Sequence, residues 1–169
     1  MLATNAYTHH LFPSLLKRFL PLYDYVLVSE PLTAAQREAI GWRNRRAVVD
    51  SRTFFNYYRL TDDGRILFGT SEAAYYPGNR VGTACDHSPA HYASLRESVR
   101  RHFAALADLA FPFAWGGPIA STTRLTPFFG LLSGRVAYGL GYTGHGIGST
   151  RLAGKILALM SERNPRVSG

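Results

Sequence analysis

The stretch Tyr58-Arg59-Leu60-Thr61-Asp62-Asp63-Gly64-Arg65-Ile66-Leu67-Phe68-Gly69 decides the architecture of the middle of this 169-residue chain. Two runs rich in β-forming residues, Thr53–Leu60 and Arg65–Phe68, flank the pair Asp63-Gly64. An Asp-Gly pair between two such runs is typical of a tight hairpin turn of the primed type. The sequence therefore predicts that the two runs pair as antiparallel strands through this turn.

Working outward from the hairpin, the chain alternates strand-like and helix-like segments. Apolar spacing or capping residues predict helices over Leu11–Leu20, after the capping box Thr33–Gln36, after Ser88-Pro89, and from the glycine-rich turn at 139–148 to Asn164-Pro165. Further strands are predicted over Leu22–Glu30, Phe111–Thr123 and Arg135–Tyr138, and Met1–Tyr7 reads as the end of a buried strand. This order indicates an α+β fold with flanking helices on a mixed or antiparallel sheet.

Composition excludes several classes of protein. Hydrophobic residues make up 46% and charged residues 18%, which excludes an intrinsically disordered chain. The net charge is +8, but the arginines are scattered, so we predict no nucleic-acid binding. No secretory signal and no apolar run of about 18 residues is visible, so we expect a cytoplasmic protein without a membrane span. Cys85 is the single cysteine, which excludes an intrachain disulfide.

The glycine-rich turn Gly139-Leu140-Gly141-Tyr142-Thr143-Gly144 matches the dinucleotide-binding pattern G-x-G-x-x-G. Too few residues follow it for the second strand and the ribose-binding acid, so the full motif is not predicted. The glycines at 141, 144, 146 and 148, however, leave backbone N–H groups bare at a helix N-terminus, which suits a flat, electron-rich ligand. Close packing of the helix on a strand is the alternative explanation.

Other clusters carry weaker signals. Cys85, His87 and His91 lie close in sequence, but Pro89 separates them, and we predict no metal site. The pairs Tyr57-Tyr58 and Tyr75-Tyr76, with Arg52 and Arg59, could line a pocket or could be ordinary strand-face residues. No catalytic residue can be assigned from spacing.

Four motifs occur in order along the chain: Ala3-Thr4-Asn5-Ala6-Tyr7, the hairpin stretch 58–69, Trp115-Gly116-Gly117, and Gly141-Tyr142-Thr143-Gly144-His145-Gly146. The set resembles the C-terminal half of FAD-dependent oxidoreductases of the D-amino-acid oxidase (DAO) family, in particular the glycine/D-amino-acid oxidase (deaminating) group and gamma-glutamylputrescine oxidoreductase. The resemblance implies a Rossmann-like FAD domain interrupted by a substrate domain. Residues 1–21 and 133–169 would belong to an incomplete FAD domain, and residues 22–132 to the substrate domain.

The resemblance also implies a cofactor, a reaction and site residues. FAD would bind noncovalently, and a hydride would pass to it from the amine-bearing carbon of a small amine or amino acid. Trp115 would lie near the substrate, and Tyr58 and Arg59, as candidate pocket residues, are the further predicted substrate contacts. The residues implied to lie near the cofactor are Thr4, Asn5, Trp115, Gly116, Gly117, Gly141, Tyr142, Thr143, Gly144, His145, Gly146, Ile147 and Gly148.

Two other functions remain open at this stage. The family's N-terminal G-x-G-x-x-G, which holds the FAD pyrophosphate, is not found in these 169 residues, so we expect a partial member that is colourless when purified alone. Such a chain could instead be a non-catalytic module that has lost FAD binding. A basic nucleic-acid-binding domain is the other alternative, and it would bind less tightly as salt rises. Substrate identity, electron acceptor and oligomeric state stay open.

Overall fold

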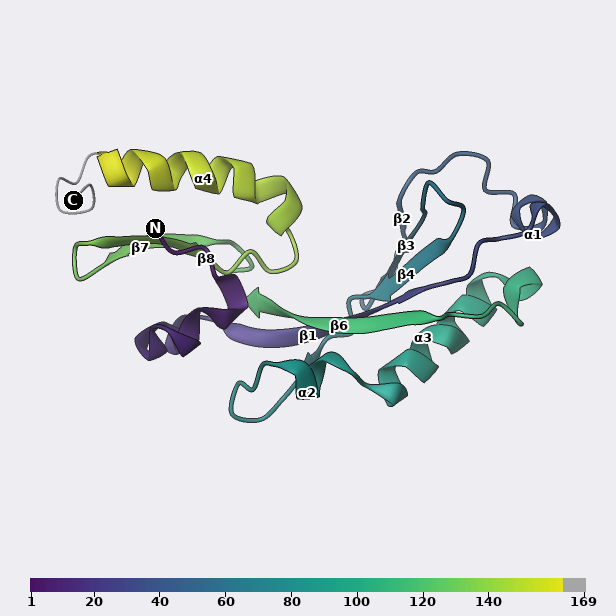
Figure 1. Ribbon diagram of the computed structural model, residues 1–169, viewed down its shortest axis with the longest axis horizontal. Coiled ribbons are helices and arrows are strands. Elements are labelled where there is room, and N and C mark those ends of the chain that lie inside the picture. The colour runs from purple at the N-terminus through teal and green to yellow at the C-terminus, as the bar shows by residue number, and fades with distance from the viewer. Residues whose placement is uncertain (163–169) are drawn as a thin grey trace. The chain divides into compact units, whose positions relative to one another are not determined.

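The computed structural model describes residues 1–162 (Figure 1). The chain divides into two compact units. The central unit comprises Tyr23–Ala74 and Gly82–Gly117, and the flanking unit comprises Met1–Leu22, Tyr75–Val81 and the residues from Pro118 onward. Tyr75–Val81 and 118–132 thus cluster with the two ends of the chain, although the sequence-based boundaries placed them in the substrate domain.

The central unit is built on an antiparallel sheet that contains the predicted hairpin. Strand β3 (Asn56–Leu60) pairs with β4 (Ile66–Thr70) from Asn56↔Thr70 to Leu60↔Ile66. The hairpin prediction is therefore confirmed. The prediction of a primed turn is wrong. A type I′ turn needs a positive φ at both central residues, and here Gly64 (φ 81°) has one but Asp63 does not.

The rest of this sheet extends on both sides of the hairpin. Strand β2 (Val48–Val49) pairs with β3, and β1 (Leu20–Val28) pairs antiparallel with β4 on the other side. The sheet order is β2-β3-β4-β1-β5, with β5 (Ala74–Tyr75) at the end, and β6 (Phe113–Ser121) also pairs with β1. The chain is thus a mixed α/β protein with antiparallel sheets.

Helix α3 (Pro89–His102) covers one face of the central sheet (Figure 1). The face of β1 that bears Tyr23, Tyr25 and Leu27 is fully buried. On α3, Val99 is fully buried and Leu95 is almost fully buried. The predicted apolar stripe of this helix is therefore its packing face. The shorter elements of this unit are α1 (Ala34–Ala39), which has the predicted capping box, α2 (Thr83–Asp86) and η3 (Ala104–Leu106).

The flanking unit combines a two-stranded ribbon with the last helix. Strand β7 (Phe128–Leu132) pairs antiparallel with β8 (Val136–Leu140), and α4 (Gly146–Glu162) lies along this ribbon (Figure 1). Leu2 forms a parallel bridge with Tyr138, and the N–H of Leu2 donates to Ala137 O (2.7 Å). Leu2 is buried, but a 3₁₀ helix already begins at Asn5, so the predicted strand end over Met1–Tyr7 is present only as the bridge at Leu2. The predicted stop of α4 at Asn164-Pro165 lies outside the described residues.

The helix predicted over Leu11–Leu20 is wrong. The structure has two 3₁₀ helices, η1 (Asn5–His10) and η2 (Pro13–Arg18), and then enters β1 at Leu20. Pro13 has no backbone N–H and restricts Phe12 to an extended conformation (φ −133°, ψ 82°), so an α-helix cannot run through this point. No helix among residues 1–162 is long and apolar enough to cross a membrane.

Candidate functional site

The turn between β8 and α4 is held in an uncommon backbone conformation. Gly141 (φ 79°), Thr143 (φ 49°) and Gly144 (φ 81°) all have positive φ, so three of four consecutive residues are left-handed. Left-handed backbone is costly for a β-branched residue such as Thr143 and persists only where surrounding contacts enforce it. Such outliers cluster at ligand-binding sites, which makes this turn a candidate.

Hydrogen bonds from Thr143 fix the turn to the end of β6. The Thr143 N–H donates to Ala120 O (3.1 Å), and the Thr122 N–H donates to Thr143 Oγ1 (3.2 Å). The Thr143 hydroxyl in turn donates to Gly141 O (3.2 Å). Thr143 therefore acts as a clamp that sets the backbone of the glycine turn.

The structure brings the first predicted motif onto this turn. Asn5 Oδ1 accepts a hydrogen bond from the Gly141 N–H (3.4 Å), although the two residues are 136 positions apart. Asn5 also has a positive φ (41°), and the neighbouring Thr4 Oγ1 lies 2.8 Å from Thr8 Oγ1. Asn5 thus joins the first motif to the glycine turn within the flanking unit.

Two of the first three residues of α4, Gly146 and Gly148, lack a side chain although the packing of the described chain does not require it. A Cβ built on Gly148 meets no atom within 4 Å, and one on Gly146 only reaches ordinary contact with Tyr142 (3.8 Å) and Thr150 (4.0 Å). Between them, Ile147 is fully exposed. Close packing of helix on strand, the alternative explanation, therefore does not account for these two glycines, whereas Gly141 does pack against Thr122 and Phe128.

The first-turn N–H groups of α4 have no partners within the helix, as in any α-helix. The first backbone bond across this turn is donated by Ser149 to His145 O (3.2 Å). The positive end of the helix dipole therefore lies at Gly146, Ile147 and Gly148, where only Ile147 carries a side chain. Such a surface can accept an electron-rich planar group against the backbone.

The Trp115-Gly116-Gly117 motif lies on β6 in the central unit. Gly116 is required by packing, because a Cβ there would overlap the ring of Tyr25. A Cβ at Gly117 would meet nothing within 4 Å, and the Trp115 side chain is 43% exposed. Trp115 and Gly117 alternate with Gly116 along the strand, so they share the sheet face opposite to Tyr25.

The two substrate residues predicted on β3 point to opposite faces of the sheet. The Tyr58 ring stacks on Phe68 with centroids 5.4 Å apart and meets the edge of Phe103, so it belongs to the face covered by α3. Arg59, the next residue along the strand, is exposed. A ligand on one face of the sheet can therefore contact only one of them.

Sequence reasoning missed a pair of polar side chains on the sheet face opposite to α3. The Tyr57 hydroxyl donates to Asp24 Oδ2 (2.6 Å), while Asp24 Oδ1 is buried without a hydrogen-bond partner in the described chain. Burial raises the pKa of Asp24 from 3.8 to about 6 and also raises the pKa of Tyr57. The signal was a lone acid, Asp24, in an otherwise apolar alternating strand.

Within residues 1–162, no group of three His, Cys, Asp or Glu side chains is arranged to hold a metal ion. Cys85 is buried, and its carbonyl oxygen accepts a hydrogen bond from the Tyr25 hydroxyl (2.7 Å).

Comparison with known proteins identifies the family. The model of the DAO family, described as FAD dependent oxidoreductase, matches residues 1–160. This chain belongs to that family. It is 32% identical to a probable oxidoreductase OrdL of Haemophilus influenzae and 30% identical to gamma-glutamylputrescine oxidoreductase of Escherichia coli, with 94% of this chain covered in each case. The chain spans about a third of the length of these curated relatives (34% and 35%).

Solved structures of an amino-acid dehydrogenase and an amino-acid oxidase share the fold. L-proline dehydrogenase from P. horikoshii matches 98% of this chain and 43% of its own with a TM-score of 0.70 at 18% identity. Glycine oxidase from Geobacillus kaustophilus matches 96% of this chain and 40% of its own, also with a TM-score of 0.70, at 17% identity. At these identities the likeness concerns the fold alone.

FAD is the cofactor of the DAO family, and the chain offers a surface that fits it. The uncovered N-terminus of α4 carries donors and a positive dipole end, which match the carbonyl edge of an isoalloxazine ring. The adjoining turn is fixed by Thr143 and Asn5, so these donors are held in place before any ligand binds. The described residues therefore fit the flavin ring of FAD.

Proposed function

We propose that this chain supplies the substrate domain and the flavin-ring contacts of an FAD-dependent oxidoreductase that oxidises the C–N bond of a small amine or amino acid. Family membership supports FAD chemistry, and the names of its relatives, which include oxidases of glycine and iminodiacetate and a gamma-glutamylputrescine oxidoreductase, support the substrate class. The observation that carries the proposal is the glycine-lined N-terminus of α4, whose bareness no packing within the described chain requires.

The two compact units fit the two roles in this proposal. The flanking unit, with the bridge of Leu2 to Tyr138 and the β8–α4 turn, would be part of a Rossmann-like FAD domain. The central unit would be the substrate domain. The pyrophosphate-binding loop of FAD would come from a segment other than residues 1–169.

Each part of the site has a proposed task. When bound, FAD would accept a hydride from the amine-bearing carbon of the substrate, and water would then hydrolyse the resulting imine. Gly146, Ile147 and Gly148 would donate backbone hydrogen bonds to the carbonyl edge of the ring and favour the negative charge of its reduced form. Asn5 and Thr143 would hold this turn in position, and Trp115 and Gly117 would face the substrate.

The proposal is tested by flavin reduction in the protein that contains this chain, loaded with FAD and kept free of oxygen. Glycine, proline and a mono-acylated diamine serve as amine substrates, and glycolate serves as a matched compound in which a hydroxyl replaces the amine. We expect at least one amine to bleach the flavin absorbance and glycolate to leave it unchanged. Bleaching by glycolate alone, or by none of the compounds, would refute amine oxidation.

A further inference from the structure

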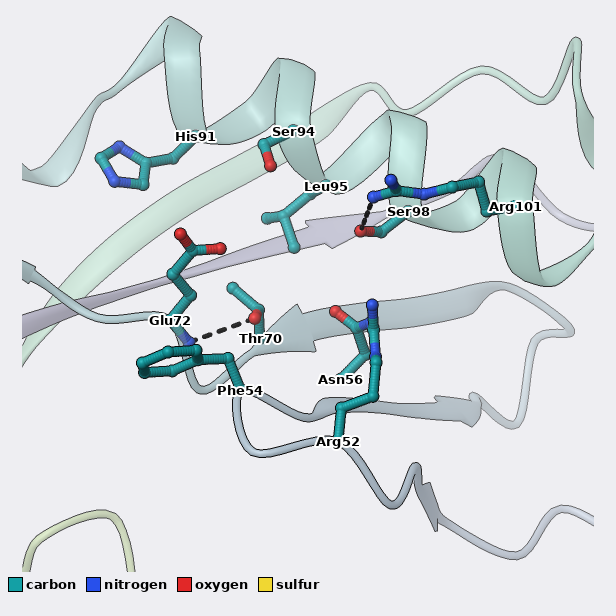
Figure 2. A pocket seen from close by; sticks show the side chains of 10 residues that line it. All are labelled: Arg52, Phe54, Asn56, Thr70, Glu72, His91, Ser94, Leu95, Ser98 and Arg101. Carbon is teal, nitrogen blue, oxygen red and sulfur yellow. Dashed lines mark hydrogen bonds between the residues drawn. The ribbon is translucent and has the colours of Figure 1, made fainter.

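A small cavity in the central unit lies between α3 and the end of the β3–β4 hairpin (Figure 2). Its volume is about 80 Å³, which is the space of only a few water molecules. None of its lining residues belongs to the glycine turn or to the Trp115 motif. The lining residues are Arg52, Phe54, Asn56, Thr70, Glu72, His91, Ser94, Leu95, Ser98 and Arg101.

Positive charge is in excess on one side of the cavity. Arg52 Nη2 lies 2.8 Å from Asp50 Oδ2, which also accepts from Asn56 Nδ2 (3.2 Å). Arg101 donates only to the neutral Ser98 Oγ (3.2 Å) and has no ion pair within residues 1–162. Both arginines also line an adjoining hollow with Asp50 and His102, and Asp50 is the single carboxylate among these four lining residues.

The charges of this cluster do not cancel at neutral pH. The Arg52 guanidinium holds the pKa of Asp50 well below its usual range, so the carboxylate is ionised throughout the physiological range. An ionised Asp50 compensates one arginine, and the charge of Arg101 is left over. The planar fork of a guanidinium suits a carboxylate or another oxyanion.

Negative charge lies at the other side of the same cavity. Figure 2 shows the Glu72 carboxylate directed into the space beside His91, away from the two arginines. The Glu72 N–H donates to Thr70 Oγ1 (3.1 Å), but its carboxylate forms no ion pair within the described chain. His91 is held beside it, because its Nδ1 lies 2.6 Å from Ser88 Oγ and its ring stacks on Tyr25.

We propose that this cavity binds a small α-amino acid as its zwitterion, with the carboxylate on Arg52 and Arg101 and the ammonium on Glu72. The opposite charges at its two sides match the two charged groups of such a ligand. Glu72 disfavours a second anionic group, and the small volume excludes long side chains. Asn56, Ser94 and Ser98 supply further polar contacts along the walls.

Glycine binding to the 169-residue chain tests the proposal. Binding is measured from changes in the amide chemical shifts of α3 and from the rise in the thermal unfolding midpoint. Flavin is not needed for this experiment, so its failure would leave the proposed oxidoreductase function untouched. Acetate and methylammonium each carry one of the two charges of glycine, and they are the matched ligands. We expect glycine to bind about tenfold or more tightly than either, because each lacks one charge-assisted contact.

Variants separate the zwitterion site from unspecific binding. R101Q and E72Q should each weaken glycine binding about tenfold or more. R100Q removes the same charge from the same helix outside the cavity and should leave binding unchanged. R101K keeps the charge without the fork and should fall between wild type and R101Q.

Three results would overturn the proposal. The first is no shift of α3 amides at any soluble glycine concentration, with the chain shown to be folded by its amide spectrum. The second is acetate or inorganic phosphate binding as tightly as glycine and insensitive to E72Q, which would indicate a simple anion site. The third is R100Q weakening glycine binding as much as R101Q.

Discussion

The Tyr57 hydroxyl reaches across Gly69 to donate a 2.6 Å hydrogen bond to Asp24 Oδ2, which links β3 to β1 over the intervening strand β4. Gly69 is paired with both Val26 of β1 and Tyr57 of β3. A Cβ on Gly69 would overlap the phenol ring of Tyr57, so the missing side chain is what lets the ring lie flat over the strand. This pair therefore lies on the sheet face opposite to α3 and joins two strands that are not neighbours in the sheet.

The raised pKa of Asp24 predicts a pH-dependent stability. Burial raises this pKa from 3.8 to about 6, so folding favours the protonated acid. The stability gained from the protonated form is complete below about pH 4 and is lost as pH rises through about 6. The variant D24N carries no ionisable group at this position. The free energy of unfolding of D24N minus that of wild type should therefore be about 2 kcal/mol larger at pH 7.5 than at pH 4.

Urea unfolding of both proteins across this pH range measures the difference. If the free energies of unfolding of wild type and D24N differ by the same amount at pH 4 and at pH 7.5, the pKa of Asp24 is not raised in the folded protein.

The substitution G69A tests the close approach of Tyr57. The added methyl group displaces the phenol ring and breaks its bond to Asp24, so we expect a loss of about 1–3 kcal/mol in the free energy of unfolding. The matched change G154A, in α4 where a Cβ meets nothing within 4 Å, should instead stabilise by about 0.5–1 kcal/mol. Equal effects of the two substitutions would contradict the account of Gly69.

The clamp formed by Thr143 gives a third prediction. T143V removes the hydroxyl that accepts from the Thr122 N–H and donates to Gly141 O, so we expect a loss of about 1–2 kcal/mol in the free energy of unfolding. T143S keeps the hydroxyl and should cost less than half as much. A loss of the same size in both variants would mean that the methyl group, and not the hydroxyl, stabilises the turn.

Local signals in the sequence predicted the hairpin and the starts of α1 and α3 correctly. The Asp-Gly pair, the Thr33 capping box and Pro89 act through residues close in sequence, and each lies at a turn or helix start in the structure. The predicted primed turn failed because the loop from Thr61 to Arg65 is longer than a two-residue turn, with the Thr61 N–H donating to Arg65 O (2.9 Å). The helix predicted from Leu11 failed because apolar spacing does not register the break at Pro13.

The site was predictable only where its residues are adjacent in the sequence. The glycines at the start of α4 were visible as a motif, and so were Thr4 and Asn5. The contact of Asn5 with Gly141, the clamp from Thr122 to Thr143, and the cluster of Arg52 with Arg101 join residues far apart in the chain. Such contacts depend on strand order and helix placement, which a single sequence does not determine.

The flavin-to-protein ratio of G146V tests whether the flavin edge lies at the N-terminus of α4. It is measured together with the melting temperature and the flavin potential, in the protein that contains this chain. A side chain at Gly146 has room within the described structure, so the melting temperature of the flavin-free protein should not change. It would, however, occupy the space of the flavin edge, so we expect lower flavin occupancy and a lower potential of the residual flavin. Unchanged occupancy and potential, or a flavin loss that only follows a fall in melting temperature, would contradict the placement of the flavin at the N-terminus of α4.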